Sequence, residues 1–522
     1  MKTVTVAQMR ELDRRTIEEA GISGEKLMER AGQGVADAVH RLAEASGYTH
    51  PVVHLVAGRG NNGGDAFAAA RILKEDGMAV MVWLAGSVSD IQGDAHVHMS
   101  RLKAARIHVD EFPTLEDWEE AKAHPAGADI LVDGILGTGS TGPARGPAAG
   151  AIQYINGQAR YALIVSIDLP SGLNGDTGTA EGDAVRADVT ITMGLPKRGL
   201  LEPAALEYVG TLEVADIGLR DEQVAEIAAE EPQFIYFPEL KALYPPRLRN
   251  THKGTYGHVL LVGGAPGYTG AITLAARAAY RSGAGLVTVL TPQSVAPLVA
   301  AGCLEAMVQA GPETETGSLH ESLWSEWRQR VEKFDAILVG PGLTRHPMGM
   351  ALVRHFIREC NKPLVLDADA LGLLEGQVHL ISKTRHPAVI TPHPGEMAGL
   401  LASTKEAVQG DRMAALRKAV VETNATVILK GAGTLVGHPG KPIHVNLTGN
   451  PGMATGGTGD VLAGMVTGLL GQGLFSFDAA RLAVYAHGRA GDLVAARKTQ
   501  AGIMASDLVE EIPYAFHTVT IR

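Results

Sequence analysis

The chain has 522 residues, of which 45% are hydrophobic and 20% charged, a balance typical of a globular protein in water. Its length exceeds one ordinary hydrophobic core, so we expect two or three domains. The formal net charge of −11 argues against a nucleic-acid partner, because such proteins usually carry a basic surface. Two cysteines and no apolar run of membrane-spanning length argue against a disulfide framework and a membrane partner, so we expect a cytoplasmic protein.

The N-terminal part of the chain predicts two helices and then alternating strands and helices. Apolar residues have helical spacing at residues 8–20 and 25–45. The first of these helices is poor in apolar residues, and we expect it to pack on a partner subunit. Further elements are predicted as strands at residues 51–57, 79–84, 130–133, 162–168, 189–193 and 212–215, and as a helix at residues 66–76 after a loop at 58–65. This alternation predicts a parallel sheet with helices on both faces.

Polar residues follow several of these predicted strands. Ligands of an α/β sheet bind beyond the carboxyl ends of the strands, which predicts one shared crevice. We expect it to be formed by Asn61, Asn62, Asp65, Asp133 and Asp168. Amides and carboxylates in the first loop suit a cation or a phosphate, although Asn and Gly also dominate ordinary turns. Asp168 either moves a proton or caps a loop N–H group.

A charged, proline-containing stretch at residues 219–245 interrupts the alternation. We assign it as a linker between a domain of residues 1–218 and a domain of residues 246–522. In the second domain, strands are predicted at residues 258–262, 286–290, 336–339, 363–367, 388–391 and 426–430, with a helix at 269–282. The second domain is therefore also expected to be α/β.

A glycine-rich turn at residues 446–464 is the most informative stretch of the second domain. Five glycines precede Asp460, and the apolar residues after it fit one buried helical face. Such a turn presents N–H groups at a helix N-terminus, where phosphate is favoured. Asp460 is then a candidate general base beside a polyphosphate, or else a helix cap.

Three more strand-end residues have a functional and a structural interpretation. Lys430 either contacts phosphate or lies solvated on the surface. Glu396 either holds a metal–phosphate group or is a first-turn acid favoured by the helix dipole. His393 lies between two prolines, and we expect its loop to be fixed in shape and functional.

In order and number, these motifs resemble those of the bifunctional NAD(P)H-hydrate repair enzymes, and the resemblance covers nearly the whole chain. The motifs of the epimerase domain stand at residues 60–65, 133, 137–139, 166–172 and 196–199. Those of the dehydratase domain stand at residues 252–254, 257, 263–264, 269–271, 281–287, 340–342, 367–370, 391–396, 430–434, 450–452 and 457–460. One departure is Ala66, at a position where the family commonly has glycine.

The resemblance implies that the first domain is a Rossmann-like parallel sheet sandwich that interconverts the R and S forms of hydrated NADH or NADPH. Asp168 would do the acid–base work at the hydrated ring carbon. Potassium would be held by Asn62, Asp133 and Ser171. The hydrate would be bound by Asn61, Asn62, Gly63, Gly64, Asp65, Gly137, Thr138, Gly139, Ser140, Thr141, Gly142, Pro143 and Asp168.

The resemblance implies that the second domain is ribokinase-like and removes water from the S hydrate while converting ADP to AMP and phosphate. Asp460 would be the general base, and magnesium would accompany the phosphates near Glu396. The hydrate would contact Ala271, Gly342, His393 and Asp460, and the nucleotide would contact Lys430, Gly431, Ala432, Gly433, Thr434 and Gly459. We also expect a homo-oligomer, either a tetramer or an octamer.

Two other functions fit parts of the sequence. A ribokinase-like vitamin kinase with an accessory domain shares the glycine-rich turn, but the histidine in Thr391–Glu396 replaces the residue usual in such kinases. Alternatively, the first domain is a non-catalytic binding or scaffold module. The aspartates Asp65, Asp133 and Asp168 argue against that second alternative.

Overall fold

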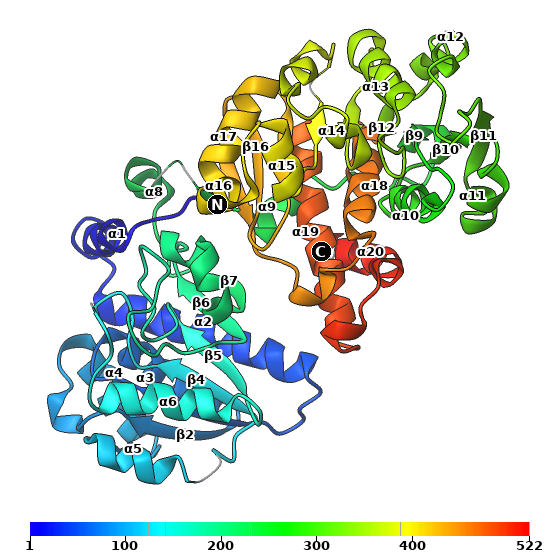
Figure 1. Ribbon diagram of the computed structural model, residues 1–522. Coiled ribbons are helices and arrows are strands. Elements are labelled where there is room, and N and C mark those ends of the chain that lie inside the picture. Colours follow the sequence, from blue (N-terminus) through cyan, green and yellow to red (C-terminus); the bar gives the residue numbers. More distant parts are fainter. Residues whose placement is uncertain (124–125, 141, 229, 231, 387, 521–522) are drawn as a thin grey trace. The chain divides into compact units, whose positions relative to one another are not determined.

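The protein is described by a computed structural model covering residues 1–123, 126–140, 142–228, 230, 232–386 and 388–520. The chain forms two compact units, Met1–Phe234 and Ile235–Arg522, each with its own core (Figure 1). The division falls within the predicted linker, where the structure has α8 (Asp221–Ile227), β8 (Gln233–Phe234) and α9 (Phe237–Lys241). Among the residues described, no helix combines the length and apolar character that a membrane span requires.

Unit 1 is built on a seven-stranded sheet with the order β3-β2-β1-β4-β5-β6-β7, in which neighbouring strands pair parallel. The strands are β1 (Val52–Ala57), β2 (Ala79–Leu84), β3 (Val109–Glu111), β4 (Ile130–Gly134), β5 (Leu163–Ile167), β6 (Val189–Met193) and β7 (Thr211–Ala215). Every predicted strand is present, and β3 is an additional short edge strand. The strand order reverses between β1 and β4, which is where such sheets form ligand crevices.

Helices cover both faces of this sheet, which confirms the Rossmann-like arrangement. They are α1 (Val6–Glu18), α2 (Gly24–Ala45), α3 (Asn61–Glu75), α4 (Gly93–Ala104), α5 (Leu115–Ala121), α6 (Pro147–Gln158) and α7 (Leu206–Val209). Alternate residues of β1 enter different cores, because successive side chains point to opposite faces. Leu55 packs in the core that contains α2, α3 and α4, whereas Val56 packs in the core that contains α5 and α6.

The predicted loop at residues 58–65 is wrong in its second half, because α3 already begins at Asn61. A Cβ atom at Gly63 would lie 1.9 Å from the carbonyl oxygen of Gly58, and one at Gly64 would lie 2.4 Å from the sulfur of Met28. These glycines therefore permit close packing of the first helical turn. Their presence does not indicate an ordinary tight turn, which was the structural alternative for this stretch.

In α1, Met9, Leu12 and Thr16 are buried, whereas Ile17, expected on the same side as Met9 and Leu12, is 41% exposed. The helix packs against α8 within the same unit. Its packing on a partner subunit stays a prediction.

Unit 2 has a second sheet, with the strand order β11-β10-β9-β12-β13-β14-β15-β16-β17. The strands are β9 (His258–Val262), β10 (Leu286–Pro292), β11 (Met307–Gly311), β12 (Ala336–Val339), β13 (Leu364–Leu366), β14 (Val389–Ile390), β15 (Thr426–Leu429), β16 (Thr434–His438) and β17 (Lys441–Asn446). The pairs β15–β16 and β16–β17 are antiparallel, and the other pairs, including β14–β15, are parallel. The sequence analysis missed the hairpin β16–β17, in which Gly437 and Pro442 weaken the strand pattern.

Helices on both faces complete unit 2 as a ribokinase-like α/β domain. They are α10 (Thr269–Arg281), α11 (Ala296–Gly302), α12 (Leu323–Trp327), α13 (Pro347–Glu359), α14 (Asp369–Gly372), α15 (Pro394–Leu400), α16 (Lys405–Gly410), α17 (Arg412–Thr423), α18 (Thr458–Gly471), α19 (Ser476–Ala495) and α20 (Ala505–Thr520), with α9 before them. Helix α18 was predicted to bury one face. In fact every residue from Val461 to Gly471 is buried, because α10, α19 and β12 all pack against it.

The contact between α18 and α10 depends on glycine, and it can be tested by Gly464→Ala. A Cβ atom at Gly464 would lie 2.2 Å from the carbonyl oxygen of Ala275, so one helix has to move. We expect Gly464→Ala to lower the free energy of unfolding of unit 2 by about 1–3 kcal/mol, measured by denaturant titration. Gly270→Ala in α10 is the control, since a Cβ atom there meets nothing within 4 Å. Equal effects of the two substitutions would contradict this account of the contact.

Candidate functional site

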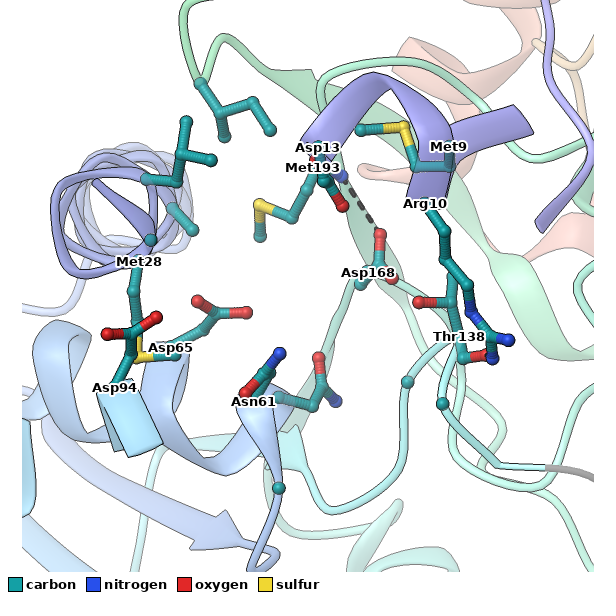
Figure 2. A pocket seen from close by; sticks show the side chains of 18 of the residues that line it. Met9, Arg10, Asp13, Met28, Asn61, Asp65, Asp94, Thr138, Asp168 and Met193 are labelled. Atoms are coloured by element: carbon teal, nitrogen blue, oxygen red, sulfur yellow. Dashed lines mark hydrogen bonds between the residues drawn. The ribbon is translucent and has the colours of Figure 1, made fainter. Parts of the chain in front are cut away.

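A cavity of about 710 Å³ lies in unit 1, where loops follow the carboxyl ends of β1, β4, β5 and β6 (Figure 2). Of the predicted site residues, it is lined by Asn61, Asn62, Asp65, Gly137, Thr138, Gly139, Ser140 and Asp168. Gly63, Gly64, Gly142 and Pro143 do not line it, and Thr141 lies outside the described residues. The sequence therefore located this crevice, although it did not predict every residue of the wall.

Asp168 and Lys197 form a buried ion pair at the cavity wall. Lys197 is 1% exposed, and its Nζ also donates to the carbonyl of Met193 at 3.0 Å. Asp168 has φ +66°, a strained conformation for a residue with a side chain, and such strain clusters at functional sites. Lys197 lies within the quoted motif at residues 196–199, but the sequence analysis gave it no role. Its position after a buried strand was the available signal.

Three further carboxyl groups, Asp13, Asp65 and Asp94, line the same cavity. Burial raises the pKa of Asp13 to about 6; the nearby Asp168 adds to this, and Lys197 opposes it. Burial, with Asp168 and Asp13, raises the pKa of Asp65 well above its usual range. Asp13 lies on α1 and was not predicted as a site residue, because no local motif marks it.

Asp133 was expected in the crevice, but this expectation is wrong. The side chain is fully buried and accepts hydrogen bonds from the hydroxyls of Ser166 at 2.8 Å and Ser171 at 2.5 Å, and from the N–H of Ser171 at 2.9 Å. Burial raises the pKa of Asp133, although these hydrogen bonds oppose the rise. The carboxylate therefore anchors the loops that follow β4 and β5 from behind the cavity wall.

The three residues predicted to hold potassium gather around the backbone of Leu136. Asn62 Nδ2 donates to the carbonyl of Leu136 at 3.1 Å, and the hydroxyl of Ser171 accepts from its N–H at 2.8 Å. The same hydroxyl bonds to Asp133. Amide, carboxylate and hydroxyl oxygens are donors suited to a hard cation, so the residue types fit the predicted ion.

In unit 2, Lys430 is placed among carboxylates. Its Nζ lies 2.9 Å from Asp367 Oδ1 and 3.6 Å from Glu396 Oε2. Burial lowers the pKa of Lys430, but Asp367 and Glu396 outweigh this effect, and the net shift is upward. Lys430 is thus a half-buried, paired cation, and its interpretation as a solvated surface residue is wrong. Asp367, which is 1% exposed, was quoted in a motif but not predicted as a site residue.

Asp460 is the third residue of α18 and follows Gly457, which has φ +94°. It therefore does not cap the helix. Burial raises the pKa of Asp460 to about 7, Asp367 adds to the rise, and Lys430 opposes it. Burial likewise raises the pKa of Glu396 to about 7, again against Lys430. Two carboxyl groups that titrate near neutrality therefore act on the same ammonium group.

His393 has a structural role that the structure displays directly. Its Nδ1 accepts from the N–H groups of Gly395 at 3.0 Å and Glu396 at 3.2 Å, while Glu396 Oε2 accepts from the N–H of His393 at 2.7 Å. This capping box begins α15. Burial lowers the pKa of His393, and Lys430 lowers it further. The loop is fixed in shape, as predicted.

The remaining predicted residues of unit 2 lie in loops and first turns. Gly342 has φ +65°, and a Cβ atom there would lie 2.6 Å from the carbonyl oxygen of Tyr268, so its loop abuts the start of α10, which contains Ala271. A Cβ atom on Gly459 would lie 3.2 Å from Lys430 Nζ. Thr434 begins β16, and Gly431, Ala432 and Gly433 form the turn before it.

Arg412 was missed by the sequence analysis. Its guanidinium group donates to the carbonyls of Ala432, Leu429 and Lys430, and so holds the turn in place. Among the residues described, no group of three or more His, Cys, Asp or Glu side chains is arranged to hold a metal ion by itself. Magnesium in nucleotide sites usually uses only one or two carboxylates together with substrate phosphates.

Comparison with known proteins finds a match in each unit. Residues 24–199 match the family model of the YjeF-related protein N-terminus, and residues 259–514 match that of NAD(P)H-hydrate dehydratase. The chain is 39% identical to the bifunctional NAD(P)H-hydrate repair enzyme Nnr of Moorella thermoacetica, over 99% of this chain and 97% of that protein. A bifunctional NAD(P)H-hydrate repair enzyme of Leishmania major is 37% identical, over 93% and 88% of the two chains.

Among solved structures, the chain is similar to the ADP/ATP-dependent NAD(P)H-hydrate dehydratase of Bacillus subtilis co-crystallised with ATP and Mg²⁺. The two are 29% identical, and the match covers 56% of this chain and 100% of that chain, with a TM-score of 0.49.

The raised pKa of Asp460 predicts a pH-dependent stability. The ordinary pKa is 3.8, so between that value and about 7 the folded state holds a proton that the unfolded state has lost. The contribution of Asp460 to the free energy of unfolding therefore falls as pH rises through this window. Asp460→Asn removes this cost, and we expect it to raise the melting temperature of unit 2 by about 2–4 °C near pH 8. Calorimetry near pH 8 and near pH 4 measures the effect. The melting temperature of the variant should rise little near pH 4, and an equal rise at both pH values would contradict the assignment.

Proposed function

The chain belongs to the family of bifunctional NAD(P)H-hydrate repair enzymes, and from this membership we propose that its two units act in succession on one damaged dinucleotide. Unit 1 interconverts the R and S forms of hydrated NADH or NADPH. Unit 2 removes water from the S form and converts ADP to AMP and phosphate. The observation that carries this conclusion is the match of both units, in order, to single-chain repair enzymes along almost their full length. A kinase with an accessory domain does not account for that match.

The cavity of unit 1 binds the hydrate. The first turn of α3, Asn61–Asp65, offers N–H groups and amides to one part of the ligand, and the loop residues Gly137–Ser140 line the cavity beside another part. Asp168 faces the cavity between them, fixed by Lys197 and by the N–H of Met193 at 3.2 Å. It moves the proton at the hydrated ring carbon.

Potassium would be held in unit 1 by Asn62, Asp133 and Ser171. When bound, it would supply positive charge that offsets the buried carboxylate of Asp133 and steadies the loop after β4. The residues themselves already bind one another through the backbone of Leu136, so the loop is formed by this chain alone.

In unit 2, Asp460 takes the proton of the hydrate hydroxyl, whose oxygen then bonds to the terminal phosphorus of ADP as AMP leaves. Loss of this phosphate, together with a proton from the neighbouring carbon, restores the ring double bond. The hydrate contacts Ala271, Gly342 and His393, and the nucleotide contacts Lys430, Gly459 and the turn Gly431–Thr434. Glu396 would hold magnesium with the phosphates, and the ion would supply charge neutralisation.

The two activities can be separated by Asp460→Asn. We expect this variant to lose ADP-dependent dehydration by about 10²-fold or more, because an amide cannot accept the hydroxyl proton, while exchange between R and S hydrates continues. Recovery of the near-ultraviolet absorbance of NADH from S hydrate and ADP measures the first activity, and chromatography of the two forms measures the second. Wild-type recovery by the variant would remove Asp460 from the mechanism.

The converse separation uses Asp168→Asn. We expect R-to-S exchange to slow by about 10²-fold or more, whereas dehydration of pure S hydrate continues at the wild-type rate. The rates are followed with pure R hydrate and pure S hydrate in parallel reactions. If exchange is unchanged, Asp168 has only the structural role of pairing with Lys197.

A further inference from the structure

Helix α1 contributes to the cavity of unit 1 although it lies outside the family-model match, which begins at residue 24. Met9, Arg10, Asp13 and Ile17 all line the cavity from this helix. The guanidinium group of Arg10 donates to the carbonyl of Thr138, in the loop proposed to bind the hydrate. The wall of the site is therefore incomplete without α1.

The position of α1 is fixed by contacts at its N-terminal end and just before it. Thr5 and Gln8 form a capping box, and Gln8 Nε2 donates to the carbonyl of Ile227 at 2.7 Å. Before the helix, Val4 pairs with the segment around Lys197: its N–H donates to Pro196 at 3.0 Å, and its carbonyl accepts from Arg198 at 2.8 Å. The backbone that leads to Asp13 is thus bonded to both neighbours of Lys197.

Asp13 and Asp65 lie close enough to Asp168 and Lys197 to interact with both electrostatically. Only Asp168 forms an ion pair with Lys197, and within the described part of the chain neither Asp13 nor Asp65 has a side-chain hydrogen bond or ion pair. Figure 2 shows the three carboxyl groups around the cavity, each carried by a different segment. Mutual repulsion of carboxylates in a partly buried site disfavours ionisation of all three, so this cluster holds a proton more tightly than free carboxyl groups do. The raised pKa values of Asp13 and Asp65 agree with that argument.

We propose that Asp13 is the second acid–base residue of the epimerase cavity, donating a proton to the hydroxyl of the hydrated ring carbon while Asp168 accepts a proton from the water that replaces it. This role rests on the proposed function of unit 1. Inversion at one carbon uses a proton donor for the leaving hydroxyl and a proton acceptor for the incoming water, and two carboxyl groups can divide these roles because the two faces of the ring react in turn. Asp13 and Asp168 are supplied by separate segments, α1 and the loop after β5.

The chemistry balances without any further reactant. Hydration of an enamine places the hydroxyl on the carbon next to nitrogen. As Asp13 protonates this hydroxyl, the carbon–oxygen bond breaks, water leaves with the bonding electrons, and the nitrogen lone pair forms a carbon–nitrogen double bond. Water then adds to the opposite face, its oxygen forms the new bond, and Asp168 takes the released proton. Exchange with cavity water returns the proton to Asp13, so one isomer replaces the other.

Several elements of unit 1 bring charged groups to the surroundings of Asp13. Asp168 and Lys197 come from the strand-end loops, Asp65 from α3, and Arg10 from α1 itself; Arg59 and Asp94 line the same cavity farther along the wall. On α8, which packs against α1, Glu226 is paired with Arg15 at 2.9 Å. The exchange rate should therefore fall as pH rises through about 6, when Asp13 loses its proton.

The test is Asp13→Asn in the full chain. We expect R-to-S exchange to fall by about 10²-fold or more and to lose its decline through about pH 6, because the amide cannot donate the proton. Binding of intact NADH to unit 1 and ADP-dependent dehydration of S hydrate should both stay at wild-type values. Glu18→Gln is the matched control, since it removes one negative charge from the same helix at an exposed position paired with Arg14. We expect wild-type exchange from it.

Three results separate the possible failures. If the wild-type protein does not exchange the hydrates, the proposed function of unit 1 fails. If the wild type exchanges them and Asp13→Asn does so at the same rate and with the same pH profile, only the role of Asp13 is overturned. If Asp13→Asn does not fold, Asp13→Glu decides: displacing the carboxyl by one methylene should slow exchange about tenfold, and an unchanged rate would overturn the role.

Discussion

Both units depend on one arrangement of charge, in which a buried or half-buried lysine at the carboxyl edge of the sheet pairs with a buried aspartate. Lys197 follows β6 and pairs with Asp168, which follows β5. Lys430 follows β15 and pairs with Asp367, which follows β13. A charge buried in this way is tolerated only when it is paired and hydrogen-bonded, so each pair fixes the loops around it. The sheets place these partners, because parallel strands end at the same edge.

Each pair is also surrounded by more acid than its lysine can neutralise. Asp13 and Asp65 face the first pair, and Asp460 and Glu396 face the second. Burial and mutual repulsion keep protons on some of these groups at pH values where free carboxyl groups are ionised. A carboxyl group poised near neutral pH is suited to proton transfer, and so the unbalanced charge becomes the reactive feature of each site.

The sequence was sufficient for most of the fold because its strongest signals are local. Buried strands in an α/β protein are short apolar runs, and glycine, proline and aspartate mark their ends. The antiparallel hairpin β16–β17 was missed, since Gly437 and Pro442 interrupt that pattern. The start of α3 was placed too late because Gly63 and Gly64 were interpreted as turn residues. They are instead required by close packing, Gly63 against the carbonyl of Gly58 and Gly64 against the side chain of Met28.

The site residues were harder to predict than the fold, because their partners are distant in sequence. Asp168 and Asp460 stand in recognisable motifs, but Asp13 lies on an amphipathic helix with no motif, and only the fold brings it to the same cavity as Asp168. Asp133 was expected to face the crevice because it ends a strand. Its carboxylate is instead turned inward, where it accepts hydrogen bonds from the hydroxyl groups of Ser166 and Ser171. The apolar pattern of the strand does not predict this orientation.

The all-round burial of α18 has a consequence for how unit 2 responds to its ligands. Glycines let this helix touch the backbone of α10, and any sliding or rotation would bring Gly464 and Gly468 out of register with the carbonyls of Ala275 and Ala279. Packed interiors resist such continuous deformation. Any movement on ligand binding is therefore expected in the surrounding segments, such as the exposed Tyr268 at the start of α10. Asp460 stays in place because α18 cannot shift.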